Sequence, residues 1–96
     1  MPKFNTVKSE VINCLKKGRF QHEVIGAIDT KNFLSTGEIS VDDVIRLISK
    51  TKGFQYECSP HHMVSGIDVH IFKPDNWYIK FYFVAPNVMF ISVHKN

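Results

Sequence analysis

Cysteine, proline and glycine are scarce in this chain of 96 residues, which contains two, four and five of them respectively. Two cysteines, Cys14 and Cys58, cannot supply the disulfide framework of a small secreted scaffold, and their separation does not match a zinc site. The hydrophobic share of 44% and the eight phenylalanines exclude a disordered chain. We therefore expect one folded domain over residues 1–96, with both cysteines as free thiols.

Long apolar runs are also missing. No stretch approaches the roughly 20 apolar residues that span a bilayer, and residues 1–5 lack the apolar segment of a signal peptide. We therefore expect a cytoplasmic protein that does not contact membranes. A glycine-rich phosphate loop and a nucleophile-elbow serine are absent. No basic helix-turn-helix is present either, and Asp42 and Asp43 at the start of a predicted helix would repel DNA phosphates.

The net charge of +3 is unevenly distributed. Residues 1–19 carry five cations against Glu10, residues 20–45 carry five anions against Lys31, and the remainder is again positive. A basic first helix beside a basic sheet face would favour a polyanion such as RNA. The same lysines also fit simple solvation of a helix.

Two helices are expected before any sheet. Asn5 or Thr6 can cap the first helix, and Gly18 predicts its end. Its apolar residues recur at helical spacing; they are Val7, Val11, Cys14 and Leu15. Ser40 and Asp43 resemble a capping box that opens a second helix, which runs to about residue 50. Residues 20–33 predict a short helix or two broken turns, and residues 35–37 predict a loop.

The last thirty residues predict three strands joined by tight turns. The strands are residues 67–72, 77–84 and 88–94, and residues 54–59 add a short earlier strand. Placing the alternate apolar residues on one face pairs Ile71 with Ile79, Val69 with Phe81, and Phe81 with Ile91. The predicted fold is α+β, with N-terminal helices packed on one face of a three- to four-stranded antiparallel β-sheet.

The uncovered face of this sheet would gather polar side chains. The predicted register places His70 opposite Lys80, Lys80 opposite Ser92, and Tyr78 opposite His94. Opposed side chains lie about 4.5–5.5 Å apart at Cβ. Histidines that exchange protons near pH 7, beside a cation, suit metal-free cleavage of RNA by its own 2′-hydroxyl. The predicted catalytic residues are His70, Tyr78, Lys80 and His94.

A second group of residues is predicted to bind substrate. A loop containing His61 and His62 can lie over the uncovered face, and aromatic side chains there suit base stacking. The predicted substrate-binding residues are His61, His62, Lys73, Tyr82, Phe90 and Ser92. We expect no cofactor and no metal. These side chains also fit plain solvent exposure or a protein partner that covers them.

The C-terminal half resembles a known family. Tyr78-Ile79-Lys80, followed by a turn and by the strand Val88-Met89-Phe90-Ile91-Ser92-Val93-His94-Lys95, is similar to the end of the MqsR toxins, which belong with the RelE-like endoribonucleases. Further similar segments are Lys17-Gly18-Arg19-Phe20, Asp42-Asp43-Val44-Ile45, Phe54-Gln55-Tyr56 and Phe72-Lys73-Pro74.

The resemblance implies a RelE-like α+β toxin that cleaves mRNA without a metal and is neutralised by a cognate antitoxin. Tyr78 and Lys80 match the family pattern. The chain departs from it at His94, where the family usually has lysine, and near His70, where it tends to have glutamine. Glu57 or a neighbour replaces a family lysine. Histidine at these positions keeps acid–base chemistry available.

Two alternatives remain open. In one, the chain is a binding module without chemistry, and its aromatic and histidine-rich face receives a protein or a small ligand. In the other, it is a metal-dependent hydrolase that uses His61, His62, His70 and Asp68. Growth arrest on overexpression distinguishes a toxin from the first, and sensitivity to a chelator identifies the second.

Overall fold

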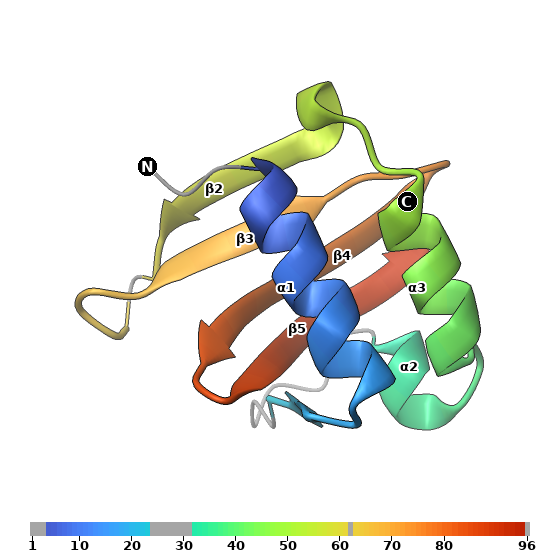
Figure 1. Ribbon diagram of the computed structural model, residues 1–96, viewed down its shortest axis with the longest axis horizontal. Helices are drawn as coiled ribbons and strands as arrows, with labels where there is room; N and C mark the ends of the chain where they lie inside the picture. Colours follow the sequence, from blue (N-terminus) through green and yellow to red (C-terminus); the bar gives the residue numbers. More distant parts are fainter. Residues whose placement is uncertain (1–3, 24–31, 62, 96) are drawn as a thin grey trace.

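The computed structural model describes residues 4–23, 32–61 and 63–95 of the chain (Figure 1). Its elements follow one another as α1 (Phe4–Lys16), β1 (Phe20–His22), α2 (Phe33–Thr36), α3 (Val41–Ser49), the 3-10 turn η1 (Gly53–Gln55), β2 (Tyr56–Pro60), β3 (Asp68–Phe72), β4 (Trp77–Val84) and β5 (Asn87–Lys95). Within these described ranges, no helix has the length and apolar character needed to cross a membrane.

The strands form one five-stranded sheet in the order β1-β5-β4-β3-β2. Neighbouring strands are antiparallel except β1, which runs parallel to β5. The α+β class is confirmed, whereas the prediction of a purely antiparallel sheet with three or four strands is wrong. The strand that was not predicted is β1, which lies where the sequence predicted a short helix or two broken turns. Phe20 of β1 packs edge-on against Phe90 of β5, with 6.4 Å between ring centroids.

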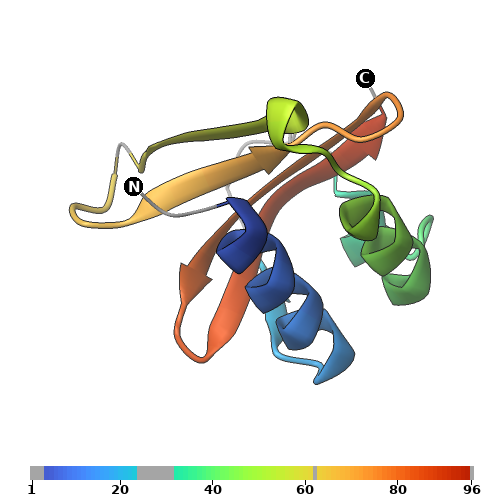
Figure 2. The same cartoon turned by 45° about the horizontal axis from the view of Figure 1, so that its top comes forward.

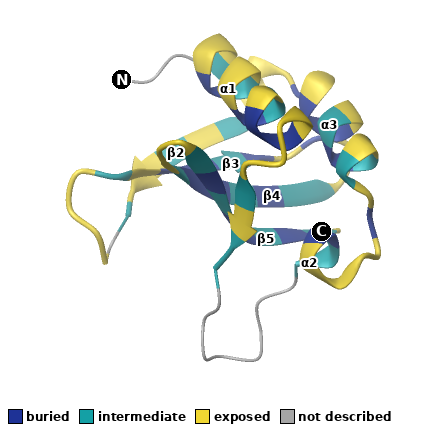
Figure 3. Cartoon of the chain, turned by 60° about the horizontal axis from the view of Figure 1, so that its bottom comes forward, coloured by how far each residue is buried: buried dark blue, intermediate teal, exposed yellow. Residues whose placement is uncertain are grey.

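Helices α1 and α3 lie together on one face of the sheet (Figures 1 and 2). The main core fills the space between them and the strands, and its fully buried members include Val11, Val44, Ile48, Phe72, Ile79, Phe81 and Phe90. Figure 3 shows the exposed outer sides of α1 and α3 above the buried strands. We call the opposite surface of the sheet the open face, because none of the described helices covers it.

Local sequence signals account for most helix boundaries. The predicted stripe of α1 is confirmed, with Val7, Val11, Cys14 and Leu15 buried. The helix begins at Phe4, so Asn5 and Thr6 lie inside it and the predicted cap there is wrong. Gly18, at φ +70°, follows its end as expected. The Ser40 hydroxyl accepts a hydrogen bond from the Asp43 amide at 3.1 Å and caps α3, as predicted.

The segment before α3 is helical rather than a loop. Asn32 caps α2 by accepting a hydrogen bond from the Ser35 amide at 3.0 Å, and Gly37 ends this helix in the left-handed region at φ +81°. The predicted loop at residues 35–37 is therefore wrong at Ser35 and Thr36. The part of the predicted helix or turns that falls on residues 24–31 lies outside the described residues.

Strand β3 pairs with β4 one residue away from the predicted register. Phe72 lies opposite Ile79, Ile71 opposite Lys80, and His70 opposite Phe81. The predicted pairs of Ile71 with Ile79 and of Val69 with Phe81 are therefore wrong. Phe72 turns toward the helices because its large ring fills the core beside Phe4, at 5.6 Å between centroids. A one-residue shift moves every side chain of a strand to the other face.

The β4–β5 pair contains a bulge between two registers. Near the Asp75-Asn76 turn the predicted pairs are confirmed: Tyr78 lies opposite His94 and Lys80 opposite Ser92. Beyond Lys80 the pairing shifts, so that Phe81 lies opposite Phe90 rather than the predicted Ile91. Ile91 is the extra residue. It joins Val69 and Tyr82 in a small apolar cluster apart from the main core.

Candidate functional site on the open face

Four side chains form two adjacent rows on the open face. Tyr78 and His94 make one row, and Lys80 and Ser92 make the next; we call these residues the His94 patch. Successive rows on one face are two residues apart along a strand, or about 6.6–7 Å. All four side chains are half-buried, so strand geometry positions them while solvent reaches them.

The His94 ring is held on both sides. It stacks on Tyr78 with ring centroids 5.2 Å apart and planes inclined by 18°. Its Nδ1 lies 2.9 Å from the Lys95 carbonyl oxygen. Because a carbonyl only accepts, we assign the proton to Nδ1, which leaves a lone pair on Nε2 of the neutral ring. His94 is thus arranged to accept a proton at Nε2.

Lys80 supplies positive charge at the centre of the open face. Within the described residues, no carboxylate forms an ion pair with its ammonium group. Lys73 differs, because its ammonium group pairs with the Glu57 carboxylate, which raises the pKa of Lys73. Lys80 is therefore better suited than Lys73 to contact an anion, because its charge is not already paired with a carboxylate of the described residues.

Tyr82 lies on the open face as predicted, but it is buried. Its hydroxyl donates a hydrogen bond to Glu23 Oε2 at 2.6 Å. Burial, followed by this bond to the carboxylate, raises the pKa of Tyr82 to about 12. The His61 ring meets Tyr82 edge-on at 4.9 Å, and His61 Nδ1 accepts the amides of Met63 and Val64, both at 3.1 Å. Tyr82 is therefore a packed phenol and not a platform open for base stacking.

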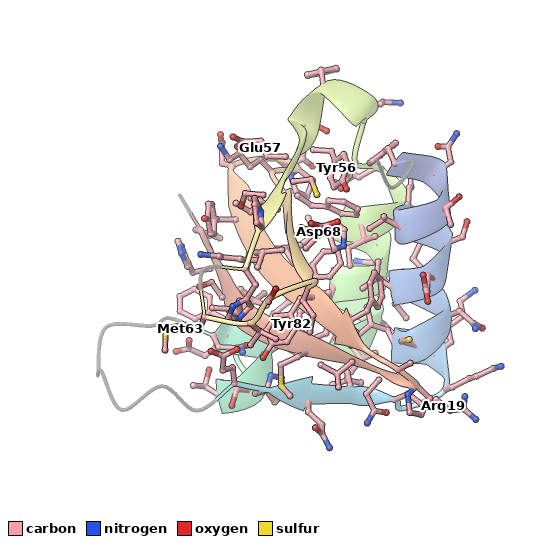
Figure 4. All side chains as sticks on the ribbon, turned by 90° about the vertical axis from the view of Figure 1, so that its left-hand side faces the viewer. Arg19, Tyr56, Glu57, Met63, Asp68 and Tyr82 are labelled. Atoms are coloured by element: carbon pink, nitrogen blue, oxygen red, sulfur yellow. The ribbon has the colours of Figure 1, made fainter. Side chains whose placement is uncertain are left out.

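A pocket of about 330 Å³ lies beside the His94 patch. We call it the Glu23 pocket; its lining is Glu23, Ser59, Pro60, His61, Met63, Val69, Lys80 and Ile91. Lys80 belongs to both the pocket and the patch. Figure 4 shows Tyr82 and Met63 on the side of the sheet away from α1. The open face thus offers a polar patch and an adjoining, mainly apolar hollow.

His70 does not belong to this site. The register of β3 turns it to the helix-covered face, where it is 4% exposed and lies 5.5 Å from both Phe81 and Phe83. Its Nδ1 shares a hydrogen bond of 2.9 Å with the Tyr56 hydroxyl. Burial lowers the pKa of His70, so the ring is neutral at pH 7. The prediction that His70 lies opposite Lys80 on the uncovered face is wrong.

One other predicted contact, Phe90, also lies away from the open face. Phe90 is completely buried in the main core, because the register beyond the bulge turns it inward. The predicted stacking role of Phe90 is therefore wrong. His62 lies outside the described residues. Ser92 keeps its predicted place opposite Lys80.

The open face also contains residues that the sequence did not single out. Glu23 reaches it from the end of β1, and Val69 and Ile91 form the apolar floor of the pocket. Glu23 carried no signal, because β1 itself was not predicted. The bulge had no clear signal either, because residues 88–91 are four consecutive apolar residues and show no alternation that an extra residue would interrupt. Among the described residues, no group of three or more histidine, cysteine or acidic side chains is placed to hold a metal ion.

No known protein-family model, curated protein or solved structure matches the chain. What the protein does must therefore be inferred from the geometry and chemistry of the open face.

Proposed function

We propose that the protein is a metal-independent endoribonuclease, a toxin of the RelE-like and MqsR-like type that cleaves mRNA in the cytoplasm and is neutralised by an antitoxin. The observation that supports this most directly is the Tyr78–His94 stack beside Lys80. It combines a proton acceptor, a hydroxyl donor and a cation on one solvent-accessible surface. RNA supplies its own nucleophile, so these three groups suffice for acid–base cleavage.

In the proposed reaction, His94 Nε2 takes the proton of a ribose 2′-hydroxyl. The 2′-oxygen forms a bond to the adjacent phosphorus, and the bond from phosphorus to the 5′-oxygen breaks. Lys80 stabilises the negative charge of the phosphorane between these events. Tyr78 donates its proton to the departing 5′-oxygen, and water then carries a proton from the His94 imidazolium back to the Tyr78 phenolate. The products are a 2′,3′-cyclic phosphate and a 5′-hydroxyl.

The catalytic roles assigned to these residues differ from those predicted from the sequence. There, His70 and His94 shared the acid and base roles, and Tyr78 positioned the phosphate. With His70 in the interior, Tyr78 becomes the proton donor because its hydroxyl has no hydrogen-bond partner among the described residues. The resemblance to the toxins is strongest at Tyr78 and Lys80, both of which lie in the patch.

The test is cleavage of a single-stranded RNA by purified protein in excess EDTA. The matched control is the same oligonucleotide with 2′-O-methyl groups, which removes the nucleophile but keeps the phosphates and bases. We expect cleavage of the first RNA alone, with cyclic phosphate ends identified by mass spectrometry. Cleavage of both RNAs would contradict the mechanism. Intact RNA in this assay and in a repeat with ribosomes would overturn the proposed function.

A binding module is the second candidate, because the open face has an apolar cluster of its own. Val69, Tyr82 and Ile91 are buried there without a helix of the described residues above them. The Glu23 pocket, of about 330 Å³, opens beside this cluster and suits a small ligand. Overexpression separates the two functions: the proposed toxin arrests growth, whereas a binding module without chemistry does not.

A further inference from the structure

The Glu23 pocket brings together a hydrogen-bond acceptor, a cation and an apolar floor. Val69 and Ile91 supply the floor, and Met63 and Pro60 contribute further apolar lining. A volume of about 330 Å³ lies at the small end of the range for ligand sites, about 300–1,000 Å³. The pocket therefore suits one planar ring system and not a peptide segment or a long chain.

Glu23 is fixed at two points. Its amide donates a hydrogen bond to the Phe90 carbonyl at 2.9 Å, which ties the end of β1 to β5. Its Oε2 accepts the Tyr82 hydroxyl at 2.6 Å. Tyr82 is itself buried in the cluster with Val69 and Ile91. The Tyr82 bond leaves Oε1 as an acceptor that is already oriented, so a ligand need not order it on binding.

The other polar end of the pocket is Lys80. Because Lys80 also belongs to the His94 patch, a ligand in the pocket can place an anionic group at the point where the proposed cleavage occurs. The pocket thus selects a molecule with a flat, partly apolar ring, a hydrogen-bond donor at one end and a phosphate at the other. A nucleotide has these features.

We propose that the Glu23 pocket binds a nucleobase that carries an exocyclic amino group. The amino group donates to Glu23, the ring lies over Val69 and Ile91, and the attached phosphate reaches Lys80. A carboxylate accepts from the N4 amino group of cytosine. It is repelled by the carbonyl oxygen that uracil has at the same position. The inference that the ligand is a nucleotide rests on the proposed function. The inference that the ligand carries a hydrogen-bond donor rests on the Glu23 carboxylate.

The experiment is calorimetric titration of the whole protein with cytidine 5′-monophosphate and, separately, uridine 5′-monophosphate. These nucleotides differ at position 4 of the ring and in the proton that uracil carries on N3, and they cannot be cleaved by attack of the 2′-hydroxyl on a neighbouring phosphodiester. We expect the cytidine nucleotide to bind about tenfold more tightly, the size expected for one hydrogen bond to a charged group. Equal affinity for the two, or binding of neither, would overturn the proposal.

Glu23→Gln is the informative variant. Its side-chain oxygen can still accept the Tyr82 hydroxyl, which keeps the local structure, and its amide nitrogen then faces the ligand as a donor. We expect the preference for cytidine to disappear or to reverse toward uridine. Glu10→Gln, on the exposed side of α1, is the matched control and should keep the wild-type preference. A Glu23→Gln protein that keeps it as well would contradict the assignment.

These results separate the pocket from the catalytic proposal. A cytidine preference that depends on Glu23, in a protein that does not cleave RNA, would support the pocket and reject the endoribonuclease. Cleavage of RNA in EDTA without any difference between the two nucleotides would do the reverse.

Discussion

Two stacked histidine–tyrosine pairs lie on opposite faces of the sheet. On the helix-covered face, His70 and Tyr56 stack at 5.9 Å and share a hydrogen bond between Nδ1 and the hydroxyl. On the open face, His94 and Tyr78 stack at 5.2 Å, and His94 Nδ1 bonds instead to a main-chain carbonyl. In the first pair, the histidine and the tyrosine are hydrogen-bonded to each other. In the second pair, the lone pair on His94 Nε2 and the Tyr78 hydroxyl stay available for a ligand.

The difference between the pairs lies in their surroundings and not in their residue types. Burial among Phe81 and Phe83 lowers the pKa of His70 and keeps it neutral, and burial raises the pKa of Tyr56. Tyr56 and His70 therefore help to hold β2 on β3. A histidine stacked on a tyrosine can therefore be a buried structural pair or a solvent-accessible pair that meets a ligand. The face of the sheet on which the pair lies decides between these roles.

The largest expected effect is the difference in RNA cleavage rate between variants of His94 and of His70. His94→Ala should lower the rate of RNA cleavage by about 10²–10⁴-fold, the usual contribution of general acid–base catalysis. His70→Asn, whose amide can replace Nδ1 in the bond to Tyr56, should cleave at the wild-type rate per folded molecule. Initial rates at a temperature where both variants are folded provide the measurement. Equal losses in the two variants would show that the faces are not functionally distinct.

The next effect concerns stability. Phe81→Ala should reduce the free energy of unfolding by about 3–5 kcal/mol, because it opens a cavity in the main core. Tyr78→Ala removes a half-buried ring from the open face and should cost about 1 kcal/mol or less. Chemical denaturation followed by circular dichroism measures both. A larger loss for Tyr78→Ala than for Phe81→Ala would reverse the assignment of the faces.

A smaller effect is expected from pH. The pKa of His70 is lowered in the folded chain and returns to about 6.5 on unfolding. Between these two values the unfolded chain binds more protons, so the free energy of unfolding falls as the pH decreases below about 6.5. The melting temperature should therefore drop between about pH 7.5 and pH 5.5.

His70→Asn should show a smaller drop over the same interval than the wild-type protein. His22, whose pKa is also lowered by burial, contributes to the part that remains in the His70 variant. If the drop is the same with and without His70, the ring is not the buried neutral group described above.

The smallest effect concerns the affinity for RNA. Lys80→Ala should weaken binding of a 2′-O-methyl RNA and reduce the slope of log affinity against log salt by about 0.7, the value for one phosphate contact on a single strand. Lys8→Ala is the control, because Lys8 lies on α1 and donates to the Thr51 carbonyl at 3.0 Å. Filter binding over a range of salt gives both slopes. An unchanged slope for Lys80→Ala would remove this residue from the RNA contact.

The sequence predicted those features that depend on local pattern. The α1 stripe and the Ser40 cap follow from spacing within a few residues, and the pairs of Tyr78 with His94 and Lys80 with Ser92 follow from the alternation of polar and apolar residues along each strand. The four residues of the His94 patch could be placed in this way, because Tyr78, Lys80, Ser92 and His94 alternate with apolar residues and the alternation assigns their faces beyond the bulge.

The remainder depended on contacts between distant parts of the chain. In β3, Val69 and Ile71 compete with His70 and Phe72 for the covered face, and both alternations contain apolar residues. The choice was decided by α1, since Phe4 packs on Phe72. Glu23 joined the site through a parallel pairing of β1 with β5, which no local pattern announces.

The bulge at Ile91 changes the parity of the chain. Before it, the even-numbered residues of β5, Val88 and Phe90, face the helices; after it, the odd-numbered Val93 does. If residues 88–94 kept one uninterrupted alternation, the even-numbered His94 would face the helices as well. Deleting Ile91 would leave every observed pair of β4 and β5 in register, but the pocket would lose part of its floor. The extra residue thus adds one apolar side chain to the open face without changing any pair between β4 and β5.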